Sequence, residues 1–232
     1  MLILGIETST KTGSIALVSE TGVIAQYSLN IEVTHSERLM STVDRVLRDT
    51  GLAIAGVDAY AVATGPGSFT GLRIGMATVK GLALVTGKPV AAVSTLAALA
   101  WNLPLSEHPV CPLLDARKNE VYAGVYLSDG MSLAEIKGDA VVPLSRLADM
   151  VSGNVIFAGE GSLLYRTELE AMFGGRCRFA PRSACLPSAA SVAEIGLSMI
   201  ENGVHAEPET LAPTYLRRPE AEVAWEKKNR SR

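Results

Sequence analysis

Aromatic residues and cysteines are scarce in this chain. Aromatics make up 5% of its 232 residues, so we expect a core of Ala, Val and Leu, in which small residues allow close packing of helices on a sheet. The three cysteines, Cys111, Cys177 and Cys185, form no C-x-x-C pair and no even framework. We therefore expect scattered buried thiols in a reducing compartment, without disulfides.

Further absences exclude whole classes of function. The net charge is −3, so the overall balance gives no support for the basic face of a nucleic-acid binder. No apolar run reaches the ~18 residues of a membrane span. The first residues lack the basic start of a signal peptide and include Glu7. We expect a cytoplasmic protein without membrane attachment. The histidines, His35, His108 and His205, show no metal-ligand spacing.

A glycine-rich segment is the most informative feature that is present. It runs from Gly65 to Gly75 and reads GPGSFTGLRIG. The apolar run 59–64 predicts a buried strand before it, and residues 72–86 predict a helix after it. Such a corner points free backbone N–H groups outward, so it suits either a bound anion or a tight turn without ligand. Its spacing matches neither a Walker A loop nor a dinucleotide fingerprint.

Strands and helices follow one another in a similar order in both halves. The first half predicts strands over 2–7, 14–19, 23–30, 59–64 and 90–93, with helices over 35–50, 72–86 and 94–101. A capping box, Thr34-His35-Ser36-Glu37, opens the first of these helices. The second half predicts strands over 110–114, 120–127 and 154–158, a turn at Asp129-Gly130, and helices over 144–150, 163–172 and 188–202.

The two halves predict an α/β protein with a duplicated βββαβα architecture. Each half begins with an apolar strand, an acidic residue (Glu7 or Asp115), a polar loop and a returning strand. We expect two lobes with a cleft between them. The N-terminal lobe is expected over 1–104, packed also by helix 188–202. The C-terminal lobe is expected over 105–218, and a flexible tail over 219–232.

Five short motifs together resemble the TsaB (YeaZ) family, over nearly the whole chain. They are Ile6-Glu7-Thr8-Ser9-Thr10, His35-Ser36, the glycine segment 65–75, Asp115-Ala116-Arg117 with Glu120-Val121-Tyr122, and Pro213-Thr214-Tyr215-Leu216-Arg217. The resemblance implies an actin/Hsp70/sugar-kinase-like (ASKHA) fold. It also implies a part in making threonylcarbamoyladenosine next to the anticodon of tRNAs that read ANN codons. In that system the related subunit TsaD transfers the threonylcarbamoyl group, TsaB-type proteins bind TsaD, and the ATPase TsaE joins them.

The sequence argues against chemistry in this chain itself. A TsaD-type enzyme holds its metal with two histidines four apart on a helix, and the corresponding segment here, 94–100, contains no ligand side chain. Active kinases of this fold have glycines after the acid of the second half, whereas residues 116–119 here all carry a Cβ that hinders phosphate. We expect no catalytic residue, no metal and no cofactor in this chain, with ATP and metal on partner subunits. For Glu7 we favour a structural hydrogen bond to the loop that follows it.

Two sets of residues remain as candidate contacts. For nucleotide or anion contact, expected to be weak, the residues are Thr8, Ser9, Thr10, Gly65, Gly67, Ser68 and Arg73. The apolar stripe of helix 35–50 is expected to be mostly core, with Met40 as the exception, because methionine suits adaptable contact surfaces. By resemblance, TsaD would bind the two long helices of the first half, through Ser36, Met40, Thr42, Val43, Thr78 and Leu82. The same surface could form a homodimer when TsaD is absent, and tRNA would be reached through the complex.

The leading interpretation is a non-catalytic partner subunit that is required, with TsaD and TsaE, for threonylcarbamoyl transfer to tRNA. One alternative is an active small-molecule kinase or ATPase of the same fold, which residues 115–119 disfavour. The other is a metallopeptidase-like protein, which would need a metal pair that the sequence lacks. The basic tail, Lys227, Lys228, Arg230 and Arg232, is typical of a solvated chain end, and direct contact with tRNA is left open.

Overall fold

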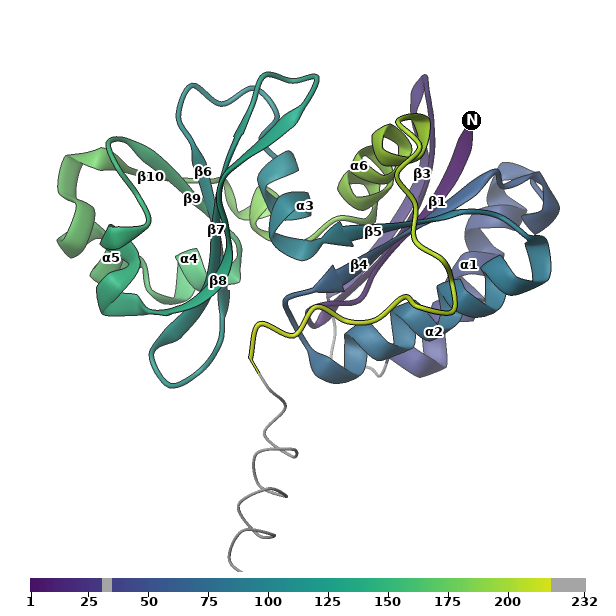
Figure 1. The fold of residues 1–232 in the computed structure, drawn as a ribbon, viewed down its shortest axis with the longest axis horizontal. Coiled ribbons are helices and arrows are strands. Elements are labelled where there is room, and N and C mark those ends of the chain that lie inside the picture. Colours follow the sequence, from purple (N-terminus) through teal and green to yellow (C-terminus); the bar gives the residue numbers. More distant parts are fainter. Residues whose placement is uncertain (31–34, 218–232) are drawn as a thin grey trace, which may run out of the picture.

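The computed structural model describes residues 1–30 and 35–217, with side chains from Glu37 onward in the helix that begins at His35. Two five-stranded sheets stand side by side (Figure 1). The first contains β1 (Leu2–Glu7), β2 (Thr12–Ser19), β3 (Gly22–Asn30), β4 (Ala59–Gly65) and β5 (Val90–Ser94), in the order β3-β2-β1-β4-β5. The second contains β6 (Val110–Asp115), β7 (Glu120–Ser128), β8 (Leu133–Pro143), β9 (Val155–Ala158) and β10 (Cys177–Phe179), in the order β10-β9-β6-β7-β8.

The predicted duplication is confirmed by the pairing of the strands. In the first sheet β1 pairs antiparallel with β2 and parallel with β4, which pairs parallel with β5. In the second sheet β6 pairs antiparallel with β7 and parallel with β9, which pairs parallel with β10. Read from β8 to β10, the second sheet therefore repeats the first sheet from β3 to β5.

Helices cover both faces of the first sheet. On one face lie α1 (His35–Thr50) and α2 (Phe69–Thr86), and on the other lies α6 (Ala189–Glu201), which comes from the far end of the chain (Figure 1). This double cover explains why every residue of β4 is buried and why its sequence, AYAVATG, is a continuous run of apolar and small residues. The small residues matter for α6. A Cβ on Gly5 of β1 would lie 2.3 Å from the carbonyl oxygen of Ala189.

The remaining helices belong to the second half or lie between the sheets. The short α3 (Thr95–Trp101) follows β5, and its N-cap is Ser94, whose Oγ accepts from the N–H groups of Leu96 and Ala97. In the second half α4 (Glu160–Leu164) and α5 (Arg166–Phe173) follow β9, and short 3-10 helices span Leu144–Asp149 and Arg182–Cys185. The three cysteines are free and buried, as expected from their spacing.

Several predicted boundaries are wrong. Helix α2 begins at Phe69 rather than residue 72, because the Oγ of Ser68 accepts from the N–H of Gly71 and caps it. The helix expected over 163–172 is two helices, α4 and α5. Strands β8 and β10 were not predicted, since β8 is a largely exposed edge strand without apolar alternation and β10 has three residues.

The remaining expectations concern Thr34, the tail, the boundary between the lobes and membrane-spanning helices. The capping-box residue Thr34 and the tail over 219–232 lie outside the described residues. The division into lobes at residues 104 and 105 stays a prediction. Within residues 1–30 and 35–217, no helix has the length and apolarity needed to cross a membrane.

Candidate functional site: the glycine corner and the α1–α2 face

The glycine corner between β4 and α2 is packed tightly against the loop that follows β1. A Cβ on Gly67 would lie 2.3 Å from the carbonyl oxygen of Ser9, which also accepts from the N–H of Ser68 at 2.5 Å. A Cβ on Gly75 would lie 2.3 Å from Oγ1 of Thr8. These glycines are therefore required for close approach of the chain to itself.

Thr8 and Ser9 are buried beneath the corner. Their exposed fractions are 0% and 1%, and Oγ1 of Thr8 donates to the carbonyl oxygen of Gly71 at 2.8 Å. The α2 corner covers both side chains, and the expectation that Thr8 and Ser9 contact a nucleotide or anion stays a prediction. Their burial could not be predicted from the sequence, because a hydroxyl-rich loop has the same sequence pattern whether its side chains face solvent or the interior.

Glu7, at the end of β1, is a fully buried carboxylate. Its Oε1 accepts from the N–H of Ser9 at 2.5 Å, which confirms the predicted hydrogen bond to the following loop. Its Oε2 has no partner among the described residues, and the same is true of Oγ of Ser9. Burial raises the pKa of Glu7 to about 7, and hydrogen bonding by Ser9, whose N–H donates to Oε1, opposes that rise.

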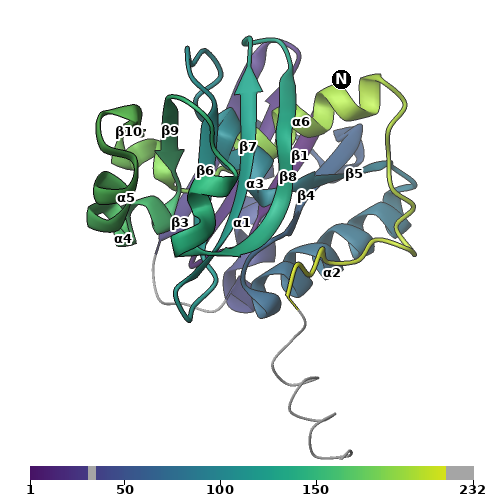
Figure 2. The ribbon, with the colours of Figure 1, turned by 60° about the vertical axis from the view of Figure 1, so that its left-hand side comes forward.

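The last described residues, 206–217, form what we call the C-terminal strap. It leaves α6, pairs with β5 where the N–H of Ala206 donates to the carbonyl oxygen of Val90 at 2.8 Å, and then runs beside α2 (Figures 1 and 2). The N–H of Thr214 donates to the carbonyl oxygen of Thr64 at 2.8 Å. A Cβ on Gly65, which has a φ of +123°, would lie 2.8 Å from the carbonyl oxygen of Thr214. The strap therefore covers Gly65, and the expectation that Gly65 contacts a nucleotide or anion stays a prediction.

Arg73 is engaged by the strap as well. Its Nε donates to the hydroxyl of Tyr215 at 3.1 Å, and its guanidinium lies 3.8 Å from the centre of the Phe69 ring. The rings of Phe69 and Tyr215 are stacked with centroids 4.8 Å apart. Arg73 thus serves to hold the strap. Of the predicted contact set, Thr10, Gly67 and Ser68 are at least partly exposed, and whether they touch an anion stays a prediction.

The facing loop of the second half, residues 115–119, is conformationally unusual. Arg117, Lys118 and Asn119 have φ angles of 61°, 57° and 56°, so three successive residues with side chains adopt the left-handed region that favours glycine. The loop is closed by a hydrogen bond of 3.0 Å from the N–H of Glu120 to the carbonyl oxygen of Arg117. Oδ1 of Asp115 accepts from the N–H of Arg117 at 2.9 Å.

An acidic pair stands beside this loop. The pKa of Glu160 is raised, first by burial and then by the nearby charge of Asp115, while Lys11 of the β1–β2 loop partly offsets the rise. The hydroxyl of Tyr165 donates to Oδ1 of Asp115 at 2.9 Å. Asp115 and Glu160 therefore place acidic groups next to the basic side chains of Arg117 and Lys118.

The described residues do not fit the nucleotide cradle that this fold type implies. The N–H group of Ser68 donates to the carbonyl oxygen of Ser9, and the strap covers Gly65. Glu160 lies near Asp115 at the start of the 115–119 loop. No group of three or more His, Cys, Asp or Glu side chains in the described ranges is placed to hold a metal ion.

The α1–α2 face is the other candidate site. The apolar stripe of α1 is buried, with exposed fractions of 6% for Leu39 and 2% for Val43, whereas Met40 is 52% exposed, as expected. Val43 therefore belongs to the core, and its assignment to the interface is wrong because it packs against the sheet. Thr42, Thr78 and Leu82 are partly exposed. The side chain of Ser36 lies outside those described.

Sequence reasoning missed one exposed apolar residue on this face. Val85 is 87% exposed and stands seven residues after Thr78, two helical turns further along α2. Thr78, Leu82 and Val85 therefore share one side of the helix. The i, i+4, i+7 spacing was visible in the sequence, but spacing alone does not tell a solvent-facing stripe from a buried one.

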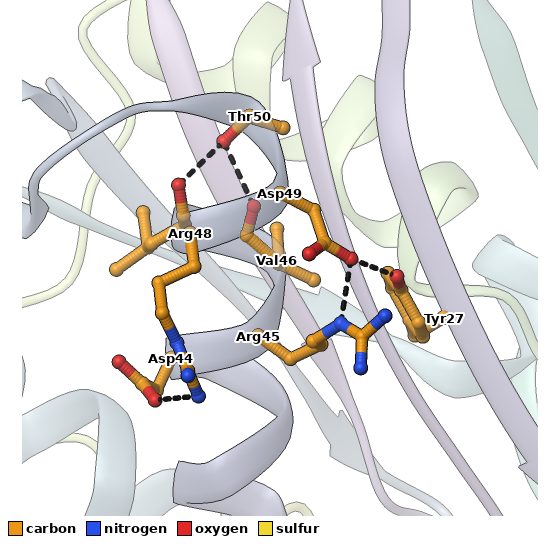
Figure 3. A network of polar contacts seen from close by, with 8 residues as sticks. Tyr27, Asp44, Arg45, Val46, Arg48, Asp49 and Thr50 are labelled. Carbon is orange, nitrogen blue, oxygen red and sulfur yellow. Dashed lines mark hydrogen bonds and ion pairs between the residues drawn. The ribbon is translucent and has the colours of Figure 1, made fainter.

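The exposed surface of α1 also carries charges that are already paired (Figure 3). Nε of Arg45 donates to Oδ2 of Asp49 at 2.7 Å, and Arg48 pairs with Asp44 one turn away. The hydroxyl of Tyr27 on β3 also donates to Asp49, and these hydrogen bonds, first from Tyr27 and then from Arg45, lower the pKa of Asp49. Such i, i+4 pairs are typical of a solvated helix surface.

Comparisons of sequence identify related proteins over nearly the whole chain. Residues 23–225 match the family model described as "TsaD: tRNA N6-adenosine threonylcarbamoyltransferase". A Bacillus subtilis (strain 168) protein named "tRNA threonylcarbamoyladenosine biosynthesis protein TsaB" is 34% identical over 228 residues, which cover 97% of this chain and 98% of the relative. An Escherichia coli (strain K12) protein of the same name is 32% identical over 234 residues and covers 98% of each chain.

Comparisons with solved structures agree with the sequence comparisons. The structure described as "YeaZ from Pseudomonas aeruginosa" matches with a TM-score of 0.79 at 32% identity, over 93% of this chain and 99% of that one. A dehydratase activator from Clostridium difficile, solved with bound ADPNP, matches with a TM-score of 0.50 at 10% identity, over 88% and 97% of the chains. At that identity the likeness concerns the fold alone. The predicted two-lobed, actin/Hsp70/sugar-kinase-like α/β fold is confirmed.

Proposed function

This chain belongs to the TsaB (YeaZ) family, and from that premise we propose that it is a non-catalytic partner subunit in tRNA threonylcarbamoyladenosine biosynthesis. Transfer of the threonylcarbamoyl group to the adenosine next to the anticodon of ANN-reading tRNAs takes place on a TsaD homologue, with the ATPase TsaE in the same complex. The observation that carries this proposal is the filled glycine corner. The corner's N–H of Ser68 donates to the carbonyl oxygen of Ser9 and the C-terminal strap covers Gly65, so both are engaged within this chain.

The buried carboxylate supports a structural role for the end of β1. A general acid or base must reach the proton that it transfers. Glu7 has an exposed fraction of 0%, and its Oε1 is directed to the N–H of Ser9. ATP and metal therefore belong to the partner subunits in this proposal, and this chain acts through its surface.

The α1–α2 face is the proposed contact for the TsaD homologue. Two helices lying side by side on one sheet expose Met40 at 52% and Val85 at 87%, and Thr78 and Leu82 are partly exposed on the same face (Figure 1). Exposed apolar side chains beside small polar ones suit a helix-on-helix interface, whose core must exclude water. Without TsaD the same face would pair with a second copy of this chain. The tRNA is reached through the complex.

Substitution of Thr78 tests this placement. The side chain of Thr78 donates to the carbonyl oxygen of Ile74 in the same helix, at 2.9 Å, so Thr78→Lys breaks no contact with another element that the described residues show, and the fold should stay intact. A lysine there would bury a charge in the proposed interface, and we expect it to abolish capture of the TsaD homologue. Thr167→Lys, an exposed threonine of α5 on the second sheet, is the matched control.

The readout is a pull-down with both variants at equal concentration, with circular dichroism melts to check folding. Loss of capture by Thr78→Lys and full capture by Thr167→Lys supports the placement. Equal capture by both variants shows that the partner binds elsewhere.

A further inference from the structure

A pocket lies on the face of the first sheet opposite α1 and α2. It has a volume of about 490 Å³ and is bounded by β2, β3, the end of α3, the connection 183–188 and the first turns of α6. Both chain segments that join the two sheets pass it, since one leaves α3 at Asn102 and the other enters α6 at Ser188. No residue of this pocket belongs to the glycine corner or to the α1–α2 face.

The polar side chains around the pocket hold one another in place. Nδ2 of Asn102 donates to the carbonyl oxygens of Ala184 and Leu186 at 3.0 and 2.9 Å, and its Oδ1 accepts from the hydroxyl of Ser191 at 2.7 Å. Nε2 of Gln26 donates to Oγ of Ser188 at 3.2 Å. Side chains fixed in this way lose little freedom when a ligand binds, which favours affinity.

Charge decides what the pocket can accept. Among the described residues that line it, Glu194 is the only ionisable one, and none is a lysine, arginine or histidine. Oε2 of Glu194 accepts from Nε1 of Trp101 at 2.6 Å, so the carboxylate is anchored to the indole beside it. The carboxylate attracts a cation through a charge-assisted hydrogen bond, and the indole of Trp101 lines the same pocket. The remaining lining is hydroxyl, amide and small apolar groups, which suits a short stem.

We propose that this pocket binds a small organic cation, an ammonium or guanidinium group on a short apolar stem. Glu194 accepts the hydrogen bond of the cation, Trp101 packs beside it, and the hydroxyl groups of α6 and β3 complete the shell. Because the pocket touches both connections between the sheets, the bound cation also ties the two lobes together. The inference does not depend on the proposed function.

Trp101 supplies the measurement. The chain has two tryptophans, Trp101 and Trp225, so Trp225→Phe leaves a single fluorophore in the pocket. Agmatine, which carries both cationic groups on an aliphatic stem, is the probe. We expect a saturable change in Trp101 emission with a Kd of about 1 mM or tighter. Butylurea, a neutral analogue of the guanidinium end, is expected to give no saturable change.

Glu194→Gln is the matched variant in the same background. Its amide oxygen can still accept from Nε1 of Trp101, so the pocket keeps its shape while losing its charge. We expect agmatine to bind this variant at least about tenfold more weakly, because a charge-assisted hydrogen bond is lost. The proposal is overturned if agmatine gives no saturable change, or if Glu194→Gln or butylurea responds as the parent does with agmatine.

Discussion

At the scale of single residues, Glu7 is held in a setting that disfavours its charge. The side chain has no solvent contact and one oxygen lacks a partner among the described residues. Its pKa rises from an ordinary 4.5 to about 7 because burial penalises the carboxylate. In this window the native protein binds more protons than the unfolded chain, so the free energy of unfolding must fall as pH rises from 4.5 to 7.

Glu7→Gln should remove this pH dependence. Between pH 5 and pH 8, the unfolding free energy of Glu7→Gln minus that of the parent should increase by on the order of 2 kcal/mol. The reason is that the parent must ionise a buried group and the variant does not. Urea unfolding at both pH values measures the difference. Glu107→Gln, at an exposed position, is the control and should follow the parent. Parallel pH profiles for Glu7→Gln and the parent would contradict the assignment.

The left-handed loop at 117–119 offers a second test on one residue. Arg117→Gly should raise the unfolding free energy by about 0.5–1 kcal/mol, because relief of left-handed strain outweighs the extra freedom of glycine in the unfolded chain. The backbone hydrogen bonds of Arg117 to Asp115 and Glu120 do not need its side chain. Arg117→Ala, which removes the charge but keeps the strain, should show no such gain. A gain of equal size in both variants would assign the effect to charge.

At the scale of elements, α2 carries glycines for opposite reasons. Gly75 is buried where a Cβ would meet Oγ1 of Thr8 at 2.3 Å, whereas a Cβ on Gly81 would meet nothing within 4 Å. The first glycine sets how closely the helix approaches β1. The second only lowers the helix propensity of an exposed turn.

Alanine substitutions at these two positions should therefore have opposite signs. Gly75→Ala should lower the unfolding free energy by about 2 kcal/mol, because the buried contact with Thr8 must give way. Gly81→Ala should raise it by about 0.5–1 kcal/mol, since alanine favours the helix. Chemical denaturation of both variants gives the comparison. Two changes of the same sign would show that α2 does not pack on β1 as described.

Most elements could be predicted from the sequence, and the exceptions have physical causes. Strands β1 and β4 are apolar on both faces and stand out as continuous runs. Strand β8 did not, because it is an edge strand that exposes Glu135 and Lys137. The candidate site was harder to predict from the sequence than the strands and helices. Hydrophobic spacing cannot tell that Val43 faces the sheet while Met40 faces solvent, nor that the strap returns to cover Gly65.

At the scale of the whole molecule, polar contacts join the two sheets. Oγ of Ser94, at the end of β5, donates to Oδ2 of Asp139 on β8 at 2.5 Å. Arg217 of the strap donates to the carbonyl oxygen of Ala116 at 2.6 Å and pairs with Glu120. The strap thus runs from α6 to the loop of the second half. These contacts favour a body that meets its partner with little change of shape, in keeping with the proposed role as a binding subunit.

The central claim is that this chain contributes a surface, and no chemistry, to the modification of tRNA. The most direct test is reconstitution of threonylcarbamoyl transfer with purified TsaD homologue, TsaE, ATP, threonylcarbamoyl-adenylate and tRNA, with and without this chain. The account predicts that modified tRNA forms only when all three proteins are present, that Glu7→Gln supports full activity, and that Thr78→Lys does not. Modified tRNA formed by this chain alone, or full activity with Thr78→Lys, would contradict it.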